Sequence, residues 1–180
     1  MAETRIFEST NEYSSTGELR HVDPDTPWVG TTDDIDISVG WCAASSAKWC
    51  RNRIEGAKPN VDPMQGAGQL TIGVMQAGYR RNYGSEGDSG LLKKTGLKAR
   101  QIFKSQPVDA TKFMVNRRGV YWFRNKGHAM ACDTRQAKSY WYDIESGCWK
   151  YDTPMEMFGA LRKYYKDSQD AWDGWLCEEE

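Results

Sequence analysis

Three side chains of this chain combine residue types and positions that suit nucleophilic catalysis. Cys42 follows the segment DISVGW and opens the segment CAASSAKWC, so we expect it at the first position of a buried helix. There a thiol meets the positive end of the helix dipole, which favours the reactive thiolate. His128 begins a short apolar segment, and Asp143 ends an aromatic one 15 residues later (143 − 128). A thiolate needs an imidazole to hold its proton and a third group to orient that imidazole, so we predict these roles for His128 and Asp143.

Each of these residues also has a purely structural interpretation. A cysteine is more often a buried structural thiol than a nucleophile, but Gly40 allows the close backbone approach that a sharp turn into the helix of Cys42 needs. His128 is the credible base because the one other histidine, His21, lies in a polar segment. Asp143 begins the segment DIESG, which is also favourable turn chemistry, so this residue taken alone fits either role.

The segments around these residues resemble the YopT and AvrPphB type of effector protease. They are GWCAASSAKW at Cys42, GHAMA at His128 and YDIESG at Asp143, and the resemblance extends over roughly residues 38 to 166. This family belongs to the papain-like cysteine peptidases, whose chain order is Cys, His, Asp, and its members are bacterial virulence factors delivered into host cells. The resemblance therefore implies a papain-like fold, a Cys-His-Asp triad and a specific protein substrate in a host or rival cell.

The oxyanion donor is where this sequence departs from the family. Papain-like enzymes usually carry Gln or Asn five or six residues before the nucleophile, whereas Ile37 and Asp36 occupy those positions here. An ionised carboxylate cannot donate a hydrogen bond. We expect the backbone N–H of Cys42 to supply one donor. The candidates for the second are Asp36, either protonated or positioning a backbone donor, and Ser38.

Composition indicates a single globular domain and limits its partners. The 180 residues suit one domain, and 24 basic residues nearly balance 25 acidic ones, for a formal net charge of −1. Because no basic footprint is present, we do not expect nucleic acid as a partner. Five cysteines cannot all pair, and none has zinc-ligand spacing, so we expect no metal and no cofactor. We expect four of them to be buried, reduced thiols, namely Cys50, Cys132, Cys148 and Cys177.

Targeting signals are weak in this sequence. No segment is apolar enough for a secretory signal or a membrane span, so we expect a soluble protein without a classical signal peptide. The resemblance implies secretion into a target or host cell by a dedicated machine, and it leaves room for a cognate chaperone or immunity protein as a partner.

The hydrophobic pattern predicts helices in the first half of the chain and strands in the second. Expected helices span residues 42 to about 54, 63–80 with Asp62 as N-cap, 88–95, and a final segment after Thr153. Expected strands span residues 120–123, 128–132, 140–142 and 148–151. Helices followed by an antiparallel sheet make an α+β domain, which the resemblance specifies as a papain-like fold with a central nucleophile helix packed on the sheet. We assign residues 34–180 to this hydrolase domain and residues 1–33 to a polar N-terminal arm.

The leading interpretation is a thiol endopeptidase. Papain-like folds also carry out the chemistry of peptidoglycan amidases, deubiquitinases, deamidases and acyltransferases, and the three residues alone do not separate these activities. A third interpretation, suggested by Asp36, is a binding module with a vestigial triad.

Overall fold

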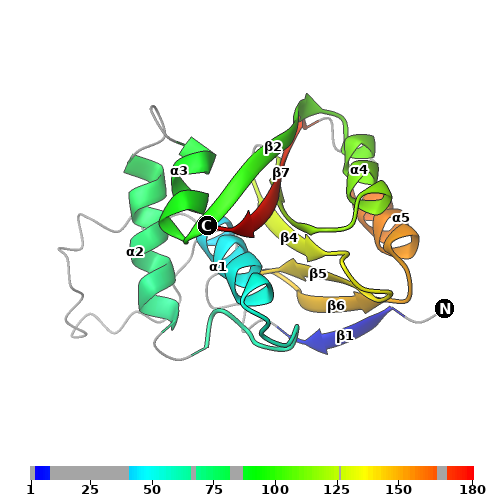
Figure 1. The fold of residues 1–180 in the computed structure, drawn as a ribbon, viewed down its shortest axis with the longest axis horizontal. Helices are drawn as coiled ribbons and strands as arrows, with labels where there is room; N and C mark the ends of the chain where they lie inside the picture. Colours follow the sequence, from blue (N-terminus) through cyan, green and yellow to red (C-terminus); the bar gives the residue numbers. More distant parts are fainter. Residues whose placement is uncertain (1–2, 9–40, 66–67, 82–86, 126, 166–169) are drawn as a thin grey trace.

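A seven-stranded antiparallel sheet is the centre of the structure. The computed structural model describes residues 3–8, 41–65, 68–81, 87–125, 127–165 and 170–180. Within them, the strand order is β1-β6-β5-β4-β3-β7-β2. Helices lie on both faces of this sheet (Figure 1).

The strands are β1 (Thr4–Phe7), β2 (Leu97–Gln106), β3 (Val120–Arg124), β4 (Ala129–Asp133), β5 (Ser139–Asp143), β6 (Gly147–Tyr151) and β7 (Trp172–Glu179). One face of the sheet packs against α1 (Cys42–Ile54), α2 (Gly68–Arg81) and α3 (Gly87–Lys94). The other face packs against the 3-10 helix η2 (Val108–Lys112), α4 (Phe113–Asn116) and α5 (Pro154–Tyr164).

Residues of a single strand contribute to two separate cores. In β3, Val120 and Trp122 pack in the cluster that contains α1, whereas Tyr121 and Phe123 pack in the cluster that contains α5. Side chains alternate between the faces of a strand, so a sheet covered on both faces needs apolar residues at every position. This double burial explains why the central strands are continuous apolar runs in the sequence.

The structure confirms several expected elements and their caps. α1 begins at Cys42 and ends at Ile54, as its small and aromatic residues predict. Thr153 is the N-cap of α5, and its hydroxyl accepts the N–H of Glu156 at 3.2 Å. Gly96, with φ of 76°, follows the end of α3. Glycine tolerates this left-handed conformation, which commonly terminates helices.

The second helix begins later than expected, and the prediction of Asp62 as its N-cap is wrong. The described part of α2 starts at Gly68. Asp62 instead closes a turn, because its carboxylate accepts the N–H of Met64 at 2.8 Å and its carbonyl accepts the N–H of Gln65 at 3.3 Å. The proline after Asp62 suits such a turn as well as it suits a helix start.

Three strands were not expected from the sequence. β7 is an interior strand between β3 and β2, β2 is the long edge strand, and β1 pairs with β6 at the opposite edge. Most residues of β2 are half-buried or exposed, so its stability comes from pairing with β7 more than from an apolar face of its own. β1 lies within the segment assigned to the polar arm, whereas the proposed boundary at residue 33 falls outside the described residues and stays a prediction.

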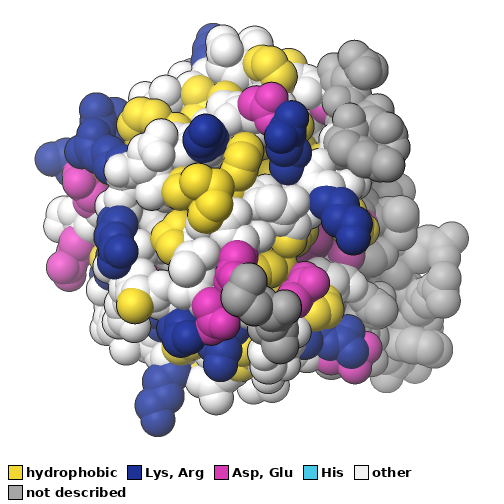
Figure 2. All heavy atoms as spheres, turned by 90° about the vertical axis from the view of Figure 1, so that its right-hand side faces the viewer, with side chains coloured by type: hydrophobic (Ala, Val, Ile, Leu, Met, Phe, Trp, Pro, Cys, Tyr) yellow, Lys and Arg dark blue, Asp and Glu magenta, His cyan; other side chains and the backbone are white. Residues whose placement is uncertain are grey.

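The described surface carries charges of both signs. On the face at the right of Figure 1, Lys and Arg side chains are interspersed with Asp and Glu, and apolar side chains form small groups (Figure 2). No single-sign patch therefore covers the described part of this face. None of the described helices is both long and apolar enough to cross a membrane.

Candidate active site

Cys42 lies at the first position of α1, where side-chain bonds hold the helix against the sheet. The indole N–H of Trp122, on β3, donates to the carbonyl of Ala43 at 3.1 Å. The hydroxyl of Ser46 donates to the carbonyl of Ala129 at 3.1 Å. Ala129 begins β4 directly after His128, so the second bond links the helix of the proposed nucleophile to the strand of the proposed base.

His128 is positioned by the turn between β3 and β4. The side-chain oxygen of Asn125 accepts the backbone N–H groups of Gly127 at 3.0 Å and of His128 at 2.8 Å. The backbone N–H of Asn125 donates in return to the carbonyl of His128 at 3.0 Å. Asn125 is buried, so these bonds fix the backbone that carries the imidazole.

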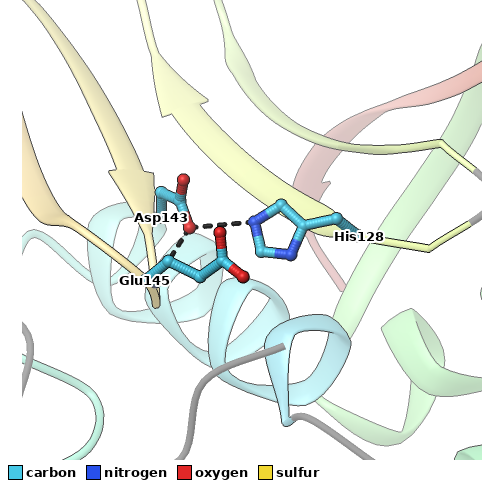
Figure 3. A group of neighbouring side chains, drawn as sticks. All are labelled: His128, Asp143 and Glu145. Atoms are coloured by element: carbon cyan, nitrogen blue, oxygen red, sulfur yellow. Dashed lines mark hydrogen bonds and ion pairs between the residues drawn. The ribbon is translucent and has the colours of Figure 1, made fainter. Parts of the chain in front are cut away.

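Asp143, the last residue of β5, faces the imidazole of His128 (Figure 3). Its Oδ1 atom lies 2.9 Å from Nε2 of His128 and also accepts the backbone N–H of Glu145 at 2.9 Å. The His128 and Asp143 side chains are only 10% and 3% exposed. A carboxylate held in this way fixes the tautomer with a proton on Nε2 and leaves Nδ1 for other chemistry.

The charge state of His128 depends on both of its proposed partners. Burial lowers the pKa of His128, but hydrogen bonding and the negative charges of Asp143 and Cys42 outweigh burial and raise this pKa to about 10. The Nδ1 atom is buried and has no hydrogen-bond partner within the described part of the chain. Nε2 of His128 thus faces Asp143, and Cys42 lies close enough to the imidazole to raise its pKa.

The remaining candidates lie outside the described residues or are paired elsewhere. Asp36, Ser38 and His21 lie outside the described residues. Asp133 ends β4 and Asp152 directly follows β6, the two strands that flank β5. Both are paired elsewhere, since Asp133 binds Arg53 and Arg135, and Asp152 binds Lys138.

The remaining cysteines differ from Cys42 in exposure. All five are free, as expected for reduced thiols, and Cys42 is the most exposed of them, at 8%. Burial raises the pKa of Cys50 and of Cys132 far above the usual thiol value, and it raises the pKa of Cys148 to about 12. These three thiols therefore stay protonated and are poor nucleophiles at neutral pH.

His128, Asp143 and Glu145 also form a group with the donor atoms of a metal site. One ligand atom from each lies within 4.8 Å of the others (Figure 3). However, Nε2 of His128 and Oδ1 of Asp143 already face one another at hydrogen-bond distance. A cation bound to Nε2 would have to displace this bond, so the group is better suited to orienting the imidazole.

Sequence reasoning missed three residues that position the site. Ser46 and Asn125 act as described above, and Gln76, on α2, accepts the backbone N–H of Ala44 at 2.9 Å. Asn125 had a signal, because an Asn and a Gly close together between two apolar segments, as in the segment NKG at residues 125–127, are typical of a turn. Ser46 and Gln76 had none, because their partners are distant in the sequence.

Comparisons with solved structures agree with this architecture. The chain is similar to the Pseudomonas avirulence protein AvrPphB, with a TM-score of 0.55 and 16% identity over 76% of this chain and 90% of that chain. It is also similar to the ubiquitin-specific protease encoded by the murine cytomegalovirus tegument protein M48, solved with a ubiquitin-based suicide substrate. Here the TM-score is 0.51 and the identity 10%, over 98% of this chain and 85% of that chain. No family model matches the sequence, and no curated protein matches it. The likeness confirms the expected α+β, papain-like fold.

Proposed function

We propose that this protein is a cysteine protease in which Cys42 is the nucleophile, His128 the general acid and base, and Asp143 the orienting carboxylate. The observation that carries the proposal is the buried His128–Asp143 pair, 2.9 Å apart, on an imidazole whose pKa also responds to Cys42. A turn residue would not need a buried imidazole partner, so the pairing favours the functional interpretation of Asp143.

The reaction follows from these positions. The Cys42 thiolate attacks the carbonyl carbon of a peptide bond, forming a C–S bond and placing the carbonyl electron pair on oxygen. Collapse of this intermediate breaks the C–N bond, and the amine leaves with the proton that His128 held on Nδ1. A water molecule then gives one proton to His128 and attacks the thioester, which releases the carboxylic acid and restores Cys42. Asp143 stabilises the imidazolium throughout without taking its proton.

The proposed biological setting is a virulence effector that cleaves a protein of a target cell. It rests on the resemblance of the segments around Cys42, His128 and Asp143 and on the shared fold with an avirulence protein. The same site chemistry would serve an amidase, a deubiquitinase, a deamidase or an acyltransferase, so the experiment must identify the bond that is cleaved. An intact, buried pair next to a cysteine argues against a vestigial triad.

Two measurements test the proposal. A thiol-directed epoxysuccinyl probe should label the wild type and fail to label Cys42→Ala, while Cys177→Ala, which removes a different buried thiol, should label normally. New protein N-termini should then appear in lysate treated with wild type or Cys177→Ala, and not with Cys42→Ala or His128→Ala. Labelling without new N-termini would refute the protease assignment, and labelling of Cys42→Ala would refute the nucleophile.

A further inference from the structure

Gln76 of α2 is a buried polar residue next to the first turn of α1. Its side chain is only 5% exposed, and its Oε1 atom accepts the N–H of Ala44 at 2.9 Å. Ala44 is the third residue of α1, and its N–H is among those at a helix start that have no partner within the helix. Gln76 therefore places a carboxamide at the N-terminus of the helix that begins with Cys42.

Close packing fixes this carboxamide relative to the nucleophile. Gly73 lies three residues before Gln76, so both lie on one side of α2. A Cβ atom added at Gly73 would be 3.0 Å from the ring of Trp41, the residue that precedes Cys42. The backbone of α2 is thus pressed against the start of α1, and the amide has little freedom to move away from it.

The orientation of the amide turns its nitrogen away from Ala44. A backbone N–H requires an acceptor, so the oxygen of Gln76 must face Ala44 and the nitrogen must point elsewhere. Within the described residues, no hydrogen bond is found in which this nitrogen donates. Two N–H donors of a buried residue are therefore held beside the turn that carries Cys42.

Acyl transfer at Cys42 requires donors of this kind. The carbonyl oxygen becomes negatively charged in the tetrahedral intermediate, and preorganised N–H groups stabilise it. The backbone N–H of Cys42 supplies one such group. We propose that Nε2 of Gln76 supplies the second and donates to the oxyanion, a role that rests on the proposed function above. The donor would then come from α2, instead of from the residues five and six positions before the cysteine.

Two substitutions separate donation from helix capping. Gln76→Glu keeps an oxygen for the N–H of Ala44 and removes the donor, whereas Gln76→Met removes both. Gln101→Glu makes the same chemical change at an exposed position of β2 and is the control. The rate of Cys42 acylation by an activated peptide ester is compared with the rate of its alkylation by iodoacetamide. Alkylation occurs at a saturated carbon and forms no oxyanion, whereas both reactions use the thiolate, so a changed thiolate pKa cancels in the ratio.

The ratio of acylation to alkylation should fall roughly 100- to 1000-fold in both Gln76 variants, as expected for loss of one oxyanion donor. It should stay at the wild-type value in Gln101→Glu. A wild-type ratio in Gln76→Glu would overturn the proposal and leave Gln76 as a helix cap. Should Gln76→Met fail to fold, Gln76→Glu decides alone. A wild type that is alkylated at Cys42 but never acylated would instead overturn the proposed function itself.

Discussion

Replacing Asp143 with Asn tests the electrostatics of the His128 imidazole directly. Asn keeps the size of the side chain and an oxygen that accepts the Nε2–H group, but it removes the negative charge. The bond joins side chains that are 10% and 3% exposed, so water screens it little. A neighbouring negative charge stabilises the imidazolium, and its removal must lower the pKa of His128.

The size of this change follows from the geometry. Two unit charges ~4 to 5 Å apart in an effective dielectric of ~20 attract by roughly 3 to 4 kcal/mol, which is roughly 2 to 3 pKa units. The pKa of His128 is about 10 in the wild type, so it should fall to about 7 or 8 in Asp143→Asn. Burial persists in the variant and acts in the same direction, because it disfavours the charged ring.

The assay is the pH dependence of kcat/KM for a peptide amide. Its alkaline limb reports loss of the imidazolium, which protonates the leaving amine. We expect this limb near pH 10 in the wild type and about 2 to 3 pH units lower in Asp143→Asn. Asp143→Ala, which also loses the bond to the N–H of Glu145, should be less active than Asp143→Asn at neutral pH. A variant that loses activity while its alkaline limb stays at the wild-type pH would refute the reasoning.

Three further predictions concern reactivity, stability and metal binding. Near-neutral alkylation should modify Cys42 before any other cysteine, and mass spectrometry of the modified peptides would contradict this if another site reacted first. Asp133→Asn should lower the free energy of unfolding by about 3 to 5 kcal/mol at neutral pH, because it leaves Arg53 buried without its partner. Burial raises the pKa of Asp133, but hydrogen bonds from Arg135 and its positive charge outweigh burial, so this pKa is lowered overall. The ionised Asp133 carboxylate therefore stabilises the folded state above about pH 4, and this stabilisation is lost in stronger acid. Denaturant unfolding of the wild type and of Asp133→Asn is therefore compared at neutral pH and in acid well below about pH 4. The prediction would be refuted if the difference between their free energies of unfolding were not smaller in acid. Excess Zn²⁺ should inhibit by displacing the bond between Nε2 of His128 and Oδ1 of Asp143. Glu145→Gln should weaken this inhibition without lowering activity in metal-free buffer, since Glu145 offers the cation a third donor atom but takes no part in the proposed reaction.

Local signals explain what the sequence predicted well. Cys42 begins a helix that the alanines after it favour. His128 and Asp143 lie next to each other because His128 directly precedes β4 and Asp143 ends β5, and these two strands pair antiparallel. Register between strands paired through short turns is strongly limited by the turns, so the approach of two such residues is readable from spacing.

Long-range pairing explains what the sequence did not predict. β2 and β7 pair with each other across most of their length, and neither has the strict alternation that identifies an isolated strand. Gln76 and Ala44 are 32 residues apart, and Ser46 and Ala129 are 83 residues apart. No pattern within a window of one helix or strand contains such information, so these positioning contacts appear only in the folded structure.

The interior position of β7 has a consequence for closure of the two cores. Residues 172–179 fill the gap between β3 and β2. Trp175 of this strand belongs to the core that contains α1, whereas Trp172 and Leu176 belong to the core that contains α5. Because β7 supplies side chains to both faces of the sheet, neither core can close until residues 172–179 have joined β3 and β2. The helix that begins at Cys42 packs in one of these cores, so its place against the sheet depends on a strand that lies about 130 residues further along the chain (172 − 42).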